Sequence, residues 1–190
     1  MKKDIILCGV GGDGIVSVAK IISDAALNLG LNVKQSEIHG MSQRGGSVST
    51  IVRVGEQVQS MIADPGCADI VVAFEAIEAL RAQQFVREGG KLFVNDEQIT
   101  PVPVNIGTFK MPEGVHESLA QIGATVIDAG GIAREVGSPR STNVVLVGAL
   151  STALPFAVAE WEDAIRRRVP PKTVEANLEA FARGREAAQA

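Results

Sequence analysis

Short apolar runs alternate with segments of helical periodicity along the chain. Residues 4–10 are apolar and stop at glycines, and from Ile15 to Leu29 apolar residues recur at the spacing of one helix face. Gly30 follows, and glycine is common just past the end of a helix. The chain is therefore predicted to begin with a strand, a tight glycine turn and a helix.

The same alternation continues to the carboxyl end. We expect further strands at residues 33–38, 47–54, 68–74, 91–94 and 125–128, and helices at residues 75–86, 115–122, 132–136, 142–154 and 173–188. The strand at 47–54 is expected to turn back through Gly55 and Glu56 into residues 58–62 as an antiparallel hairpin. Residues 104–109 are assigned to an edge strand, since prolines just before them cannot donate to a ladder.

Alternating strands and helices, with nearly continuous apolar strands, predict one α/β domain over residues 1–190. The expected architecture is a three-layer α/β/α sandwich with a Rossmann-like, mostly parallel sheet and an inserted antiparallel hairpin. Ligands of such sheets bind at the carboxyl ends of the strands. The first glycine loop is residues 9–14, and the second glycine loop is residues 39–46. If the strands that precede them are neighbours, both loops should lie at the same rim of the sheet, where the strands have their carboxyl ends.

Charge and cysteine content argue against several functions. The chain has 18 Lys and Arg against 22 Asp and Glu, a net charge of −4. This argues against a nucleic-acid partner, since affinity for nucleic acid comes mainly from clustered cations. Cys8 and Cys67 are too few for a four-thiolate zinc site or a cubane iron-sulfur cluster, so no metal is expected on this chain.

Targeting signals are not evident in the sequence. Two lysines near the amino terminus lead directly into the first predicted strand, without the apolar stretch of a signal peptide. Residues 141–159 are uncharged but contain polar residues and a proline, whereas a membrane span needs about 20 mainly apolar residues. We therefore expect no membrane partner and a cytoplasmic location.

The first glycine loop reads Gly-Val-Gly-Gly-Asp-Gly and fits the pattern G-x-G-x-x-G. Between a strand and a helix, such a loop can hold a phosphate with backbone N–H groups and the helix dipole. A dinucleotide site also needs an acidic residue about 20 positions later, and Glu37 roughly meets this requirement. The same glycines also suit a plain tight turn with close helix packing. Asp13 is unsuited to holding an anion and is expected to cap the following helix.

The second glycine loop concentrates side chains that a turn does not need. Arg44 offers a planar fork for phosphate or carboxylate, Ser42 and Gln43 add neutral donors, and His39 can exchange a proton near neutral pH. These residues favour a binding or catalytic role. In the alternative, His39 and Arg44 only cap strand ends or bridge to Glu37.

Both loops together resemble the gamma family of the 2-oxoacid:ferredoxin oxidoreductases, and within it the beta-subunit branch of indolepyruvate ferredoxin oxidoreductases. The first loop is similar to the family's G-x-G-G-Q-G, and residues 35–48 are similar to its Q-S-E-x-H-G-M-x-Q-R-G-G-S-V signature. Residues 143–150, 154–155 and 172–184 add similarity, so the resemblance spans almost the whole chain. Asp13 departs from the pattern, because it replaces the usual Gln with an anion that only accepts hydrogen bonds.

The resemblance implies a cofactor-free subunit of an enzyme that oxidatively decarboxylates a 2-oxoacid, an arylpyruvate such as indolepyruvate, to an acyl-CoA. It implies ferredoxin as electron acceptor, and thiamine diphosphate and iron-sulfur clusters on a larger partner subunit, with this chain inactive alone. His39 is the catalytic candidate, and coenzyme A is the expected co-substrate. The residues expected to bind coenzyme A are Gly9, Gly11, Gly12, Asp13, Gly14, Ser42, Gln43, Arg44, Gly45 and Gly46.

Two other functions remain compatible with these residues. One is a self-contained NAD(P)-binding or nucleotide-binding Rossmann-like protein, which would use glycines of the first loop together with Glu37. That function leaves its catalytic acid and base unnamed. The other is a non-enzymatic regulatory binding module that keeps the fold without the chemistry, and the unusual Asp13 would fit such a loss.

Overall fold

A mixed β-sheet forms the centre of the computed structural model, which describes residues 1–39, 46–58 and 61–190. Among these residues the strand order across the sheet is β2-β3-β1-β4-β5-β6. β3 runs antiparallel to both of its neighbours, β1 and β2, whereas β1, β4, β5 and β6 run parallel to one another. The strands are β1 (Lys2–Val10), β2 (Asn32–His39), β3 (Ser47–Gly55), β4 (Ala68–Ala73), β5 (Val86–Asn95) and β6 (Thr125–Ile127).

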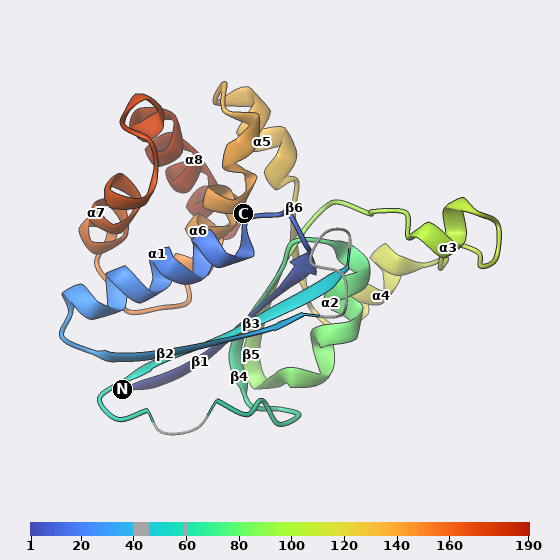
Figure 1. Ribbon diagram of the computed structural model, residues 1–190, viewed down its shortest axis with the longest axis horizontal. Coiled ribbons are helices and arrows are strands. Elements are labelled where there is room, and N and C mark those ends of the chain that lie inside the picture. Colours follow the sequence, from blue (N-terminus) through green and yellow to red (C-terminus); the bar gives the residue numbers. More distant parts are fainter. Residues whose placement is uncertain (40–45, 59–60) are drawn as a thin grey trace.

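Helices cover both faces of this sheet (Figure 1), which confirms the predicted three-layer sandwich. The first face carries α1 (Ile15–Asn28), α5 (Ala129–Glu135), α6 (Thr142–Ser151), α7 (Val158–Arg168) and α8 (Val174–Ala187). The second face carries α2 (Ala76–Ala82) and α4 (Val115–Gln121). The short helix α3 (Val102–Asn105) projects away from the sheet. Short 3-10 helices are η1 (Gln83–Phe85), η2 (Pro139–Ser141) and η3 (Pro171–Thr173).

The alternation of side chains along each strand divides the core into two parts. On β1, Ile5 and Leu7 pack into the core on the α1 side, and Ile6 and Cys8 pack into the core on the α2 side. Every residue of β4 is buried, because helices lie on both faces of this central strand. The continuous apolar run of β4 in the sequence has this cause.

Two strands predicted from the sequence are wrong. The described residues at 57–58 and 61–62 form no strand, because β3 already has β1 on one edge and β2 on the other. The antiparallel hairpin exists, but its strands are β2 and β3. Residues 104–109 also form no strand: Asn105 ends α3, and turns follow it. Pro101 precedes α3, a place where its missing N–H costs no helical hydrogen bond.

Helices α6 and α8 pack with their backbones in contact. A Cβ atom added at Gly148 would overlap the carbonyl oxygen of Phe181, and one added at Gly184 would overlap the carbonyl oxygen of Val145. All residues of α6 from Val144 onward are buried. The helix therefore lies inside the molecule. No helix in the described ranges is long and apolar enough to cross a membrane.

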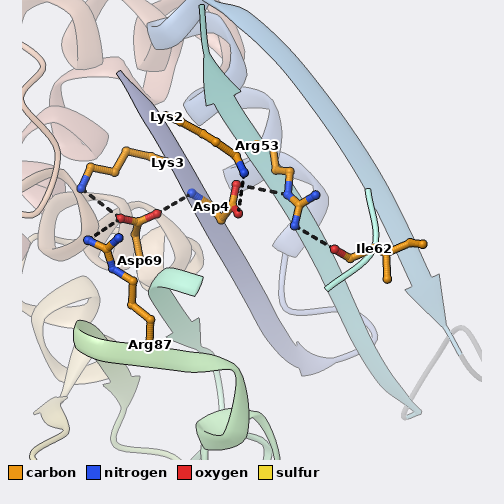
Figure 2. A network of polar contacts seen from close by, with 7 residues as sticks. All are labelled: Lys2, Lys3, Asp4, Arg53, Ile62, Asp69 and Arg87. Atoms are coloured by element: carbon orange, nitrogen blue, oxygen red, sulfur yellow. Dashed lines mark hydrogen bonds and ion pairs between the residues drawn. The ribbon is translucent and has the colours of Figure 1, made fainter. Parts of the chain in front are cut away.

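Buried charges tie the strands together at the amino end of β1 (Figure 2). Arg53 of β3 pairs with Asp4 of β1 over 3.1 Å and donates to the carbonyl of Ile62 over 2.8 Å. Asp69 of β4 accepts the N–H of Asp4 over 2.8 Å and pairs with Arg87 of β5 over 2.8 Å. This network connects β1, β3, β4 and β5 at the end of the sheet opposite the glycine loops. It therefore stabilises the fold and is not part of a binding site there.

Candidate functional site

The two glycine loops meet at the carboxyl edge of the parallel strands. The N–H of Gly11 donates to the carbonyl oxygen of Gly46 over 2.9 Å. The contact follows from the sheet, because β3 is antiparallel to β1 and its first residue, Ser47, lies opposite Val10. Both loops lie at one rim, as predicted, but the strands that precede them are not neighbours, because β3 lies between β1 and β2.

The first glycine loop requires glycine for steric reasons. Gly12 and Gly14 have φ angles of 123° and 81°, values that residues with a Cβ atom rarely adopt. A Cβ at Gly14 would also lie 2.8 Å from Nδ2 of Asn143 on α6. Gly9 is restricted by packing, since its Cβ would lie 2.7 Å from Cβ of Phe74. These glycines are therefore needed for the tight turn and its close packing, whether or not the loop also binds a ligand.

Asp13 closes this turn rather than capping the helix. Its Oδ2 accepts the N–H of Val10 over 2.9 Å. Gly14 precedes α1, whose first turn has no side-chain cap, so the predicted helix cap at Asp13 is wrong. The carboxylate is held by a donor on the strand side of the loop. Burial raises the pKa of Asp13, the N–H of Val10 opposes this shift, and the carboxylate of Glu97 adds to it.

One cavity opens between the first glycine loop and β2, with a volume of about 330 Å³. We call it the loop cavity. Glu37 and His39 both line it, because residues two apart on a strand project to the same side. Its other walls are the loop backbone, the first turn of α1 and Val48. The cavity therefore combines bare backbone, a helix N-terminus without acidic residues, a carboxylate and an imidazole.

A second hollow, of about 420 Å³, lies on the other side of the same loop. We call it the switch-point hollow, because β1 leads through α1 toward β2, whereas β4 leads through α2 toward β5 on the opposite side. Open α/β sheets commonly bind ligands at such a point. Its side-chain walls are Phe74, Asn95, Glu97, Arg140, Thr142 and Asn143, together with Asp13 of the loop.

Sequence reasoning missed the part of this hollow that comes from distant segments. No sequence pattern singles out Asn95 at the end of β5, although it is buried and donates to the carbonyl of Phe74 over 3.2 Å. Arg140 and Asn143 precede or begin α6, and the only sequence signal for this region was the family resemblance at residues 143–150. Their proximity to the first loop depends on the packing of α6 against α1.

Two buried glutamates on the α2 side position the rim. Glu78, 7% exposed, accepts the hydroxyl of Ser47 over 2.5 Å and pairs with Arg81 over 2.6 Å. Glu75, 2% exposed, accepts the N–H of Glu78 over 2.9 Å and that of Ile99 over 3.1 Å. Burial raises the pKa of Glu75. Glu75 thus caps α2, and Glu78 fastens the start of β3.

The described residues predicted for the site all lie around this rim. His39 is exposed at the carboxyl end of β2, beside the loop cavity. Ser42, Gln43, Arg44 and Gly45 lie outside the described residues. The described members are Gly9, Gly11, Gly12, Asp13, Gly14, His39 and Gly46.

The other candidate side chains lie elsewhere. Cys8 is buried, donates to the carbonyl of Glu78 over 3.7 Å, and has its thiol pKa raised by burial. His116 lies exposed on α4, 2.7 Å from Asp96, and this hydrogen bond and charge raise its pKa. No group of three or more His, Cys, Asp or Glu side chains able to hold a metal occurs within the described ranges.

The chain is similar in sequence to known proteins over nearly its whole length. The family model of pyruvate ferredoxin/flavodoxin oxidoreductase matches residues 4–187. Indolepyruvate oxidoreductase subunit IorB of Thermococcus kodakarensis is 40% identical over 193 residues, which cover 98% of this chain and 96% of that protein. 2-Oxoglutarate synthase subunit KorC of Methanothermobacter marburgensis is 29% identical, over 98% of this chain and 96% of that protein.

Two solved structures share the fold. The gamma subunit of a keto/oxoacid ferredoxin oxidoreductase from Geobacter sulfurreducens superposes with a TM-score of 0.71 at 24% identity, over 98% of both chains. The 2-oxoglutarate:ferredoxin oxidoreductase of Magnetococcus marinus, with 2-oxoglutarate, coenzyme A and succinyl-CoA bound, gives a TM-score of 0.76 at 24% identity. That match covers 99% of this chain and 31% of the other, so this fold forms one part of a longer chain there.

Proposed function

The chain belongs to the pyruvate ferredoxin/flavodoxin oxidoreductase family, and we propose that it is the small gamma-type subunit of an arylpyruvate:ferredoxin oxidoreductase complex. The observation that carries the proposal is the full-length similarity to indolepyruvate oxidoreductase subunits, which exceeds the similarity to 2-oxoglutarate synthase subunits. In the reaction, the bond between the carboxylate carbon and the keto carbon breaks and CO₂ leaves. An electron pair passes to ferredoxin, and the sulfur of coenzyme A bonds to the acyl carbon as its thiol proton is released.

The redox cofactors are assigned to a larger partner subunit. This chain has two cysteines, and a cubane iron-sulfur cluster needs four soft ligands. Thiamine diphosphate, when bound on the partner, supplies the stabilisation of the carbanion that decarboxylation leaves. On this basis the chain alone is inactive, and its contribution is to bind and orient coenzyme A against the partner's site.

The shared rim suits the phosphates of coenzyme A. The loop cavity brings glycine backbone and the N-terminus of α1 together, the arrangement that binds pyrophosphate in many nucleotide sites. Arg44 adds a cation from the second loop, and Asp13 directs its carboxylate toward the N–H of Val10. His39 lines the cavity and is our candidate for accepting the thiol proton of coenzyme A.

The two alternatives are less well supported. Glu37 lines the loop cavity, as a nicotinamide dinucleotide site would need. However, relatives that match over nearly the full length are named as subunits of indolepyruvate oxidoreductase or of 2-oxoglutarate synthase, so a self-contained nucleotide-binding protein or a regulatory module is not favoured.

The proposal is tested by purifying the tagged chain anaerobically from its native host and identifying the proteins that copurify. The preparation is then assayed for coenzyme A-dependent viologen reduction with indolepyruvate, phenylpyruvate, pyruvate and 2-oxoglutarate. A brown, thiamine-containing partner with turnover of an arylpyruvate is the expected result. Turnover of only pyruvate or 2-oxoglutarate would contradict the substrate class, and a colourless chain without activity would contradict the proposal as a whole.

The role of the second loop has a separate test. Arg44→Ala in the complex should raise the KM for coenzyme A about tenfold with little change in kcat, since a charge-assisted contact to phosphate is lost. Arg166→Ala removes a cation from the exposed face of α7 and is the control. An equal KM in the wild type and Arg44→Ala would remove Arg44 from the site.

A further inference from the structure

A third hollow, of about 300 Å³, lies beside α1 and is lined by cations from three separate segments. Arg140 comes from η2, Arg168 from the end of α7 and Lys172 from η3. No carboxylate lines this hollow among the described residues. We call it the cationic hollow.

Two of these cations have no partner among the described residues. Asp24 binds Arg168 through two hydrogen bonds of 2.6 and 2.8 Å, so that side chain is already paired. Arg140 and Lys172 are exposed and form no hydrogen bond or ion pair in the part of the chain that the structure describes. In a chain of net charge −4, two unpaired cations beside one hollow indicate a place for an anion.

Neutral groups complete the hollow. The side chains of Ser17 on α1 and Asn143 on α6 line it, and neither has a hydrogen-bond partner among residues 1–39, 46–58 and 61–190. Ile21 and Val144, both almost fully buried, form an apolar floor. A hydroxyl, an amide, a guanidinium and an ammonium therefore all have donors available toward one space.

We propose that the cationic hollow binds a phosphate monoester through Arg140 and Lys172. A guanidinium matches two phosphate oxygens with its planar fork, and an ammonium adds a point charge. A bound dianion would also offset the repulsion between the two cations.

The ligand can come from two sources, both with the same chemistry. Arg140 and Asn143 line the switch-point hollow as well as the cationic hollow, so one ligand can extend from the first glycine loop into both. Coenzyme A carries a monoester at its 3′ position, and this assignment rests on the proposed function. A free phosphorylated compound requires only the hollow itself.

Binding to the full-length chain is the first test. Isothermal titration calorimetry is carried out with inorganic phosphate and with adenosine 3′,5′-bisphosphate as probes, on wild type, Lys172→Gln and the double variant Arg140→Gln, Lys172→Gln. We expect Lys172→Gln to weaken binding and the double variant to weaken it about tenfold or more. The matched control is Lys110→Gln, Arg166→Gln, which removes the same charge elsewhere on the surface and should bind like wild type.

Three outcomes would overturn the inference. These are no phosphate binding by the wild type, equal binding by wild type and double variant, and an equal loss in the control, which would show only a general charge effect. All substituted side chains are exposed, and equal thermal unfolding midpoints verify that the variants fold.

The active complex distinguishes the two sources. If coenzyme A is the ligand, Lys172→Gln raises the KM for coenzyme A but not for dephospho-coenzyme A, which lacks the 3′-phosphate. If phosphate binding by the chain is lost while both KM values stay unchanged, the ligand is a free phosphorylated compound. A complex without turnover of any 2-oxoacid would contradict the proposed function and leave the calorimetric result standing.

Discussion

Glu78 of α2 accepts a hydrogen bond from the hydroxyl of Ser47 on β3 over 2.5 Å, and this bond holds the start of β3 against α2. Gly46, the residue before Ser47, accepts the N–H of Gly11 over 2.9 Å. The point where the second glycine loop joins β3 is thus held by α2 and by the first glycine loop. A change at Glu78 should therefore weaken the hold on the start of β3.

Ser47→Ala tests this fastening. The variant leaves one oxygen of a buried carboxylate without its donor, so we expect a loss of about 1–3 kcal/mol in the free energy of unfolding. Urea unfolding of the full chain measures it. Ser49→Ala, two residues later on the same strand, is the control and should change the value by less than about 0.5 kcal/mol. Equal losses in both variants would contradict a specific role for the bond.

Gly14→Ala tests the close approach of α6 to the first glycine loop. Gly66 has a similar φ of 71° but open space around it, so Gly66→Ala should cost only the backbone strain, about 1 kcal/mol. Gly14→Ala should cost more, because its Cβ would lie 2.8 Å from Nδ2 of Asn143. The excess should shrink when Asn143 is also replaced by Ala. An unchanged excess in that double variant would show that Asn143 is not the obstacle.

Asp13→Asn tests the electrostatic cost of the buried carboxylate. The pKa of Asp13 is raised by burial, so the folded chain binds this proton more readily than the unfolded chain between the unfolded and folded pKa values. The contribution of Asp13 to stability therefore falls as pH rises through that window and stays low at neutral pH. Asn keeps an oxygen that can accept the N–H of Val10.

The expected result is that Asp13→Asn is more stable than wild type at neutral pH and equal to it well below the unfolded pKa of about 3.9, where Asp13 is protonated in both states. Urea unfolding of both proteins at the two pH values measures this. A stability difference that does not depend on pH would mean that the side chain acts through packing and not through its charge.

Gly184→Ala tests the backbone contact between α6 and α8. The new methyl group would overlap the carbonyl of Val145, so α8 must move, and we expect a loss of about 2–3 kcal/mol or more. Ala182→Gly, on the exposed side of α8, should cost about 1 kcal/mol through helix propensity alone. If thermal unfolding shows Gly184→Ala to be as stable as wild type, the two helices are not in backbone contact.

Local pattern was sufficient for most elements of the fold. The apolar run of β1, the buried run of β4 and the helical spacing of α1 and α8 were predictable, because side-chain alternation repeats within a few residues of chain. The polar, cationic composition of the second glycine loop also singled it out, since a turn does not need those side chains. Its contact with the first glycine loop depends on the pairing of β3 with β1, which brings Gly46 beside Gly11.

The sequence by itself thus determined the α/β class, the two glycine loops and the family to which they belong. Only the tertiary structure decided that β3 inserts between β1 and β2, because apolar strands carry no local mark of their partner. Tertiary packing alone also brings Arg140, Asn143 and Lys172 beside the start of α1. Such contacts join segments more than 100 residues apart, and they depend on how helices pack over the sheet rather than on any periodicity along the chain.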